Sequence, residues 1–89
     1  MNPVPAASLE ARIREVYDSL TGNETRLADV ILAAPGEVAT HTAAELSTLA
    51  GISPATTTRF FRRLRYGSYE EARRQARGAQ KAGSPLYLQ

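Results

Sequence analysis

The amino-acid sequence predicts an all-α fold of about five helices. Apolar residues recur every three or four positions along most of the chain, which is the spacing of a helix that buries one side. A threonine or serine precedes a glutamate by three positions at three places, the spacing of a capping box, and no segment alternates apolar and polar residues long enough to predict a strand. Because 89 residues supply one modest core, we expect a single domain at residues 9–77, between a disordered N-terminus at 1–8 and a linker at 78–89.

The first two helices are separated by a start signal. The apolar stripe of the first helix consists of Leu9, Ile13, Val16, Tyr17 and Leu20. Thr21 and Glu24 then have capping-box spacing, so a second helix begins here and continues to the stop at Pro35–Gly36. We expect its inward side chains to be Leu27, Val30, Ile31 and Ala34.

A third, short helix begins at the next capping box, formed by Thr42 and Glu45. Its expected inward residues are Leu46, Leu49 and Ala50. Gly51 follows where a left-handed backbone angle would end the helix, and glycine adopts that angle without a Cβ penalty. The small side chain of Ser47 lets this helix approach the next one closely.

A fourth helix starts only three residues later, because Ser53 is a strong N-cap and Pro54 suits the first helical position. Two helices joined by so short a turn cross at a steep angle, as in a helix-turn-helix, and Ile52 would fill the corner between them. The predicted fold is therefore an all-α, homeodomain-like helix-turn-helix bundle.

The fourth helix, at residues 54–64, has two different faces. The inward face is mostly apolar and comprises Thr57, Phe60, Phe61 and Leu64, so we expect both phenylalanines to lie in the core rather than to stack on bases. The outward face comprises Ala55, Thr58, Arg59, Arg62 and Arg65, with Thr56 beside the helix start. Small residues early and guanidinium groups late suit a DNA major groove, since they allow close approach, hydrogen bonding to base edges and contact with phosphate.

A last helix is predicted at residues 68–77, opened by the capping-box pair Ser68 and Glu71. The composition from Gly78 onward is typical of a linker, yet the chain ends with the apolar residues Leu86, Tyr87 and Leu88. We therefore expect the chain to be a fragment that ends near a domain boundary.

The charge is unevenly distributed. Residues 1–58 carry three arginines against seven carboxylates, a net charge of −4, whereas residues 59–89 carry eight basic side chains against two carboxylates, a net charge of +6. Such an asymmetry indicates a polyanion as partner, most often nucleic acid, although a solvated basic tail has the same composition.

Composition also excludes several functions. The chain has no cysteine and only one histidine, His41, so thiolate chemistry and a multi-histidine metal site are absent. There is no glycine-rich phosphate loop and no paired carboxylates, so we expect no enzyme, no cofactor and no metal. A signal peptide and a membrane span are also lacking, which predicts a soluble cytoplasmic protein.

The string Gly-Ile-Ser-x-Ala-Thr-x-x-Arg-Phe-x-Arg-x-Leu, which begins at Gly51, resembles the N-terminal domain of RpiR-type transcriptional regulators. The resemblance covers about residues 9–75. It implies a bacterial helix-turn-helix domain that binds operator DNA as a homodimer. It also implies regulation of sugar-metabolism genes, with a sugar-phosphate effector that binds an absent C-terminal domain. This chain departs from the family pattern at Arg65 and Ser68, where the family usually has glycine, so we expect a different turn there and an added phosphate contact from Arg65.

By position, the resemblance implies that Ser53, Thr56, Arg59 and Arg62 face DNA. With the outward residues of the fourth helix, its further arginines and a phosphate contact at the start of the third helix, the full predicted set is Thr42, Ser53, Ala55, Thr56, Thr58, Arg59, Arg62, Arg63 and Arg65. Two alternatives remain open. The domain could be a helical protein-interaction module without specific DNA binding, and the first-helix stripe could serve either the core or a dimer interface.

Overall fold

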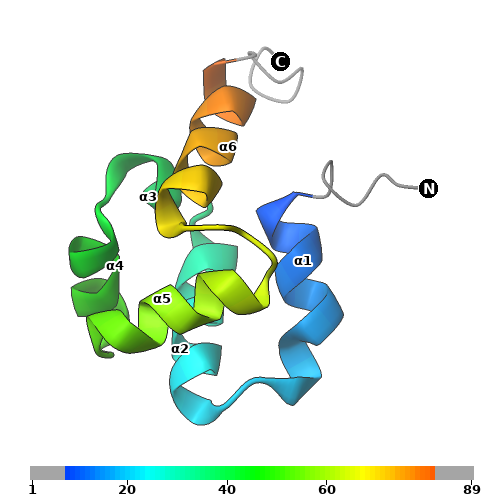
Figure 1. The fold of residues 1–89 in the computed structure, drawn as a ribbon, viewed down its shortest axis with the longest axis vertical. Helices are drawn as coiled ribbons and strands as arrows, with labels where there is room; N and C mark the ends of the chain where they lie inside the picture. The colour runs from blue at the N-terminus through cyan, green and yellow to red at the C-terminus, as the bar shows by residue number, and fades with distance from the viewer. Residues whose placement is uncertain (1–7, 82–89) are drawn as a thin grey trace.

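The computed structural model describes residues 8–81, with side chains through residue 78. The described part is all-helical, as predicted, and contains no strand. Its elements are α1 (Leu9–Val16), the 3-10 helix η2 (Tyr17–Ser19), α2 (Gly22–Ala33), α3 (Gly36–Thr40), α4 (Ala43–Ala50), α5 (Pro54–Arg63) and α6 (Tyr69–Lys81) (Figure 1).

The helices form a bundle around α5. In Figure 1, α5 crosses in front of α2, with α4 on one side of it and α1 on the other. α5 packs against α4, α2 and α6, and α6 in turn packs on α3. None of the helices described here combines the length and apolar character needed to cross a bilayer.

The core is built where the inward faces of these helices meet. The largest fully buried side chains are Phe60, Phe61, Ile13, Leu27, Ile31, Leu46, Val38, Thr57 and Ser47. Phe61 is central: its ring lies edge-on to Phe60 and Tyr69, with centroids 5.3 Å and 5.0 Å away. Such edge-to-face pairs add to the stabilisation from burial. The predicted inward face of α5 is confirmed, and the two phenylalanines belong to the core.

The predicted boundary between the first two helices is confirmed. Thr21 accepts a hydrogen bond from the Glu24 backbone N–H, and the Glu24 carboxylate accepts one from the Thr21 N–H, at 3.2 Å and 2.9 Å. The first helix is shorter than expected, because the α-helix ends at Val16 and tightens into η2. The Ser19 hydroxyl donates to the Val16 carbonyl at 2.8 Å and thereby satisfies this exposed acceptor.

The helix α3 was not predicted, since Pro35–Gly36 was expected only to end the second helix. α2 indeed ends at Ala33, but one further helical turn follows at Gly36–Thr40. It is stabilised by contacts with α6, far along the chain: the Arg77 side chain donates to the Ala39 carbonyl at 3.1 Å, and the Tyr69 hydroxyl lies 3.0 Å from the Val38 carbonyl. No local sequence signal encodes these contacts.

The prediction that Leu49 faces inward is wrong, because this side chain is 51% exposed. The buried residues of α4 are instead Leu46, Ser47 and Ala50. Ser47 faces inward beside Leu46 and Ala50, and its hydroxyl is paired across the interface with the Thr57 hydroxyl of α5.

The described fold begins at the cap of α1 and ends with α6. The expected disordered segment lies outside the described residues except for Ser8, which caps α1. α6 extends past the predicted end at Arg77 to Lys81, so the first part of the expected linker is helical. The remainder of that linker, with its apolar end, lies outside the described residues.

Candidate nucleic-acid interface

The turn between α4 and α5 has the predicted geometry. Gly51 is left-handed, with φ 71° and ψ 37°. The N–H groups of Gly51 and Ile52 donate to the carbonyls of Thr48 and Ser47 at 3.2 Å and 3.0 Å, the pattern of a Schellman motif. Ser53 caps α5 by accepting from the Thr56 N–H at 3.1 Å, and Ile52 packs half-buried against the core. A three-residue turn thus joins two crossing helices.

A buried hydroxyl pair fixes the contact between these two helices. The Oγ of Ser47 lies 2.6 Å from Oγ1 of Thr57, and it lies 2.7 Å from the Ala43 carbonyl, to which it donates. Thr57 therefore donates to Ser47, since the Ser47 proton is already used. Both side chains are essentially excluded from solvent. This pair explains why a threonine stands at an inward position of α5.

The outward face of α5 is exposed as predicted. Ala55, Thr58, Arg59, Arg62 and Arg65 are exposed, and Thr56 is half-buried. The Thr56 hydroxyl lies 3.0 Å from the Ser53 hydroxyl, and the Arg59 guanidinium lies 3.4 Å from the Thr56 hydroxyl, to which it donates. These contacts link Ser53, Thr56 and Arg59 along the exposed side of the helix.

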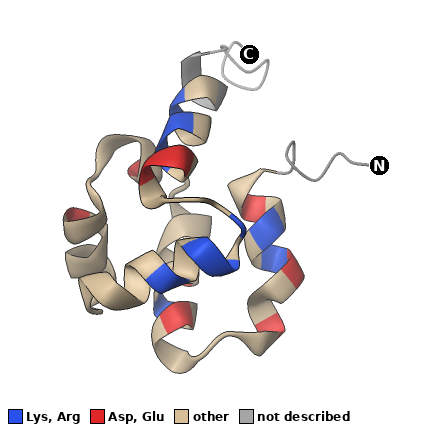
Figure 2. Cartoon of the chain, in the orientation of Figure 1, with Lys and Arg blue, Asp and Glu red and all other residues tan. Residues whose placement is uncertain are grey.

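The arginines near α5 divide into two groups. Within the part of the chain whose side chains are described, the guanidinium groups of Arg62 and Arg65 make no hydrogen bond and no ion pair. Figure 2 shows basic positions along the front of α5 and in the turn that follows it. These two guanidinium groups are therefore available to an external anion.

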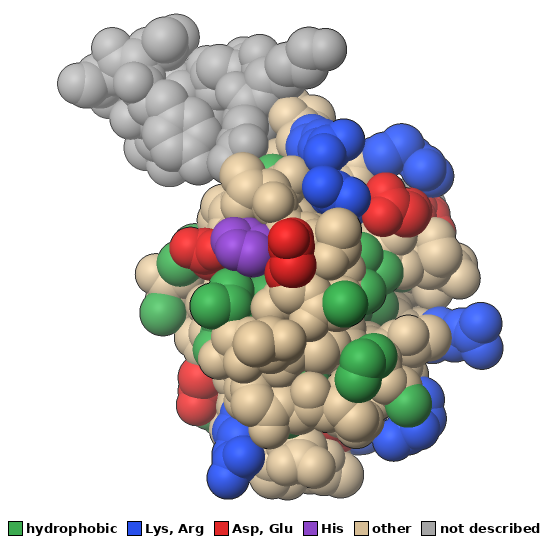
Figure 3. All heavy atoms as spheres, turned by 90° about the vertical axis from the view of Figure 1, so that its left-hand side faces the viewer, with side chains coloured by type: hydrophobic (Ala, Val, Ile, Leu, Met, Phe, Trp, Pro, Cys, Tyr) green, Lys and Arg blue, Asp and Glu red, His purple; other side chains and the backbone are tan. Residues whose placement is uncertain are grey.

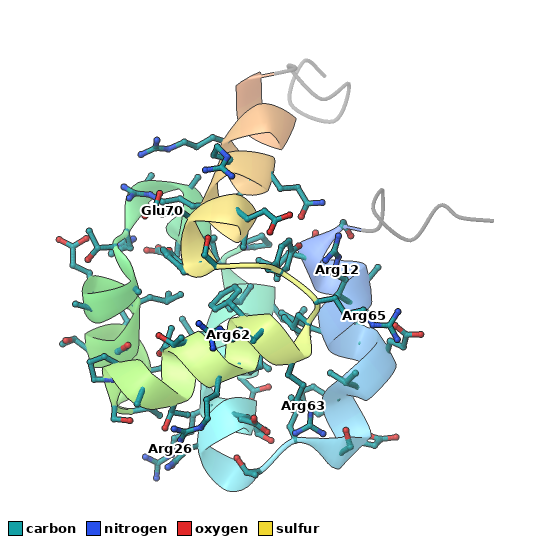
Figure 4. All side chains as sticks on the ribbon, viewed as in Figure 1. Arg12, Arg26, Arg62, Arg63, Arg65 and Glu70 are labelled. Carbon is teal, nitrogen blue, oxygen red and sulfur yellow. The ribbon has the colours of Figure 1, made fainter. Side chains whose placement is uncertain are left out.

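Arg63 belongs to the other group. Its guanidinium donates to the Glu24 carboxylate at 3.0 Å, and to the carbonyl and hydroxyl of Ser19 at 3.0 Å and 2.7 Å. Figure 4 shows Arg63 and Arg62 on different sides of α5, with Arg63 directed toward the corner between α1 and α2. Although the sequence placed Arg63 in the DNA-binding set, the structure engages its charge within the protein.

Thr42 is also engaged within the protein. Its hydroxyl accepts from the Glu45 N–H at 3.1 Å, and its own N–H donates to the Glu45 carboxylate at 2.8 Å, which lowers the pKa of that carboxyl. Nearby, His41 lies 3.1 Å from the Glu37 carboxylate. Figure 3 shows His41 between acidic side chains on this face. Since the start of α4 already carries negative charge, it is poorly suited to a phosphate.

Two arginines near α5 were absent from the predicted set. Arg26 is exposed on α2, which packs against α5, and its guanidinium makes no hydrogen bond or ion pair among the described residues. Figure 4 shows Arg26 extending below the N-terminal half of α5. Arg12 contacts the turn that follows α5. Both lie in the acidic half of the sequence, and only the fold brings them to the basic helix.

The first-helix stripe lies largely within the core. Leu9 and Ile13 are buried, and Val16, Tyr17 and Leu20 pack half-buried against the core. A shallow hollow of about 330 Å³ opens beside them, lined by Arg14, Tyr17, Asp18 and Leu32. The described residues contain no group of three or more His, Cys, Asp or Glu side chains placed to hold a metal ion.

Comparison with known proteins identifies the same helix-turn-helix architecture. The family model for the helix-turn-helix domain of the rpiR family matches residues 7–80. No curated protein matches the chain. The match covers α1 to α6 almost completely, so it applies to the whole described fold and not to the turn alone.

Proposed function

The chain belongs to the rpiR family of helix-turn-helix domains and is thus a DNA-binding regulator domain, and from this premise we propose that α5 is its recognition helix, which enters the major groove. The main supporting observation is the outward face of α5, where small residues at the start are followed by Arg59 and by Arg62, whose guanidinium has no partner among the described residues. An α-helix fits the major groove of B-DNA, and small residues let its N-terminus approach the base edges.

The proposed contacts follow from the side chains that the fold leaves available. Thr56, Thr58 and Arg59 or Arg62 read bases, since threonine can bond a base edge or touch a thymine methyl and arginine can bond guanine in a bidentate manner. Ser53 and Ala55 lie at the helix start, where backbone N–H groups and the helix dipole favour phosphate. Arg65 and Arg26 are proposed to contact phosphates on either side of α5. Arg63 and Thr42 are assigned to the fold.

We also propose a homodimer that binds an inverted repeat. Two recognition helices would then enter successive major grooves about 34 Å apart. The surface beside α1, with its half-buried Tyr17 and the shallow hollow around Arg14 and Asp18, is the proposed contact between the two copies. As the family resemblance implies, the proposed targets are sugar-metabolism genes, with a sugar phosphate that acts through a separate domain.

The test is selection of the purified domain against a randomised duplex pool, followed by fluorescence anisotropy on enriched and unenriched DNA at several salt concentrations. We expect an inverted repeat that binds on the order of a thousandfold more tightly than the pool. If no sequence is enriched and binding disappears as salt rises, the basic face is only electrostatic, and the protein-interaction alternative replaces this proposal.

Arg59→Ala tests the recognition helix directly. We expect it to weaken binding to the enriched site by about 1–3 kcal/mol and binding to the pool much less, because a base contact is sequence-specific. Arg74→Ala is the matched control, since it removes the same charge from an exposed arginine on α6, away from both the recognition helix and the proposed dimer contact. Equal losses for the two variants on every sequence would remove Arg59 from the base-reading set.

A further inference from the structure

The turn after α5 contains an unfavourable backbone conformation. Among the described residues, Arg65 alone combines a side chain with a positive φ, which is 73°. A residue with a Cβ adopts this region at an energetic penalty, and such a conformation persists only where the surroundings fix it. The Arg65 side chain does not fix it, because it is exposed and has no partner within the described part of the chain.

The backbone around Arg65 accounts for part of this constraint. The Arg65 N–H donates to the Arg62 carbonyl at 2.9 Å, and the Tyr66 N–H donates to the Phe61 carbonyl at 3.1 Å. This is a Schellman motif, which requires the left-handed angle at its penultimate residue. Leu64 and Tyr66, the neighbours of Arg65 in the chain, are 2% and 4% exposed. The backbone of Arg65 therefore joins two residues whose side chains are fixed in the core.

Arg12 supplies the rest of the constraint from α1. Its Nη1 donates to the Leu64 carbonyl at 3.0 Å, and its guanidinium carbon lies 4.1 Å from the centre of the Tyr66 ring. The Arg12 guanidinium therefore contacts both neighbours of Arg65: it makes a charge-assisted hydrogen bond to Leu64 and a cation–π contact with Tyr66. Figure 4 shows Arg12 and Arg65 together where α1 meets the turn.

From this arrangement we infer that Arg12 is a positioning residue for DNA binding: it holds the turn at residues 64–66 so that Arg65 is presented to a backbone phosphate beside α5. This inference rests on the proposed function. Arg12 itself does not need to touch DNA, because its guanidinium faces the Leu64 carbonyl and the Tyr66 ring. A glycine at residue 65 would relieve the backbone but supply no cation.

The test compares wild type, Arg12→Met, Arg65→Gly and the double variant. Binding to the enriched duplex is measured by anisotropy over a salt series, and the slope of log K against log salt reports the number of phosphate contacts. We expect Arg65→Gly to make the slope shallower by about 0.9, with a similar loss of affinity on all sequences. Arg12→Met should reproduce most of that change alone and add nothing in the double variant.

Arg12→Lys controls for net charge. Lysine keeps the positive charge but lacks the planar group that contacts the carbonyl and the ring together, so the slope should still become shallower. Circular dichroism at the binding temperature ensures that only folded variants are compared, and Arg12→Lys replaces Arg12→Met if the latter unfolds.

Three outcomes would overturn the inference. The first is a wild-type slope in Arg12→Met. The second is that Arg12→Met makes the slope shallower by the same amount whether it is added to wild type or to Arg65→Gly. The third is a wild-type slope in Arg12→Lys, which would make Arg12 a direct charge contact. If wild type itself enriches no sequence, the proposed function fails instead, and the two failures are thereby distinguished.

Discussion

Replacing Arg63 with methionine is expected to destabilise the domain by about 2 kcal/mol, whereas Arg62→Met should change stability by less than about 0.5 kcal/mol. Methionine keeps an apolar stem and removes the guanidinium, so each variant loses one charge and little packing. Arg63 donates hydrogen bonds to Glu24 and Ser19, and Arg62 has no partner in the described part of the chain.

The magnitude follows from the surroundings of the broken contact. Hydrogen bonds to a charged group contribute roughly 1.5–3 kcal/mol. The Glu24 side chain is 11% exposed, which favours the upper part of that range, but Arg63 is 38% exposed, so solvent screening lowers the expected value. After the substitution Glu24 keeps one bond, from the Thr21 N–H. In a chain of this length, about 2 kcal/mol lowers Tm by roughly 8–16 °C.

Urea denaturation, monitored by circular dichroism, measures the loss of stability. Fluorescence anisotropy on the enriched duplex measures the DNA affinity of the folded protein. Arg63→Met should lose stability and keep an affinity close to that of Arg74→Met, which removes the same net charge from an exposed position on α6. Arg62→Met should keep stability and lose affinity. The reasoning is refuted if Arg63→Met unfolds at the wild-type urea concentration, or if Arg62→Met and Arg63→Met lose equal affinity.

Three further predictions concern stability. Thr57→Val removes the hydroxyl 2.6 Å from Ser47 and keeps the side-chain shape, so it should cost about 1 kcal/mol in urea denaturation, and a wild-type midpoint would show that the buried pair contributes nothing. Burial raises the pKa of Tyr69 from 10.0 to about 12, so its contribution is complete below pH 10 and is lost as pH rises toward 12. The difference in stability between wild type and Tyr69→Phe should therefore shrink over that interval, and a constant difference would contradict it. Arg65→Gly should raise the free energy of unfolding by about 1 kcal/mol, because glycine adopts a φ of 73° without strain; an unchanged or lowered Tm would argue against strain.

Arg65 and Ser68, the two positions at which the resemblance implied glycine, have different structural outcomes. Arg65 adopts a left-handed backbone angle, the conformation that glycine adopts without strain. Ser68 accepts a hydrogen bond from the Glu71 N–H at 3.3 Å, as its capping position predicts. The Glu71 carboxylate accepts a hydrogen bond from the Gly67 N–H, which is one residue earlier than the donor of a capping box.

The sequence by itself determined the features that depend on neighbours within one helical turn. The capping boxes at Thr21 and Thr42, the left-handed Gly51 and the N-cap Ser53 are all present as predicted, because each joins groups no more than five residues apart. The inward and outward faces of α5 were predictable for the same reason, since helical periodicity fixes them locally.

Only the tertiary structure decided which arginine remains available and which residues of α4 are buried. Arg62 and Arg63 both belong to the set predicted to bind DNA, yet the Arg63 side chain contacts Glu24, which lies 39 residues away, and the Arg62 side chain contacts no partner among the described residues. In α4 Leu49 is exposed, while the smaller Ser47 is buried and paired with Thr57 across the helix interface. The helix α3 and the contact of Arg12 with the turn at residues 64–66 likewise depend on contacts between distant segments. Periodicity within a helix carries no information on these contacts, since they form only when separate helices pack together.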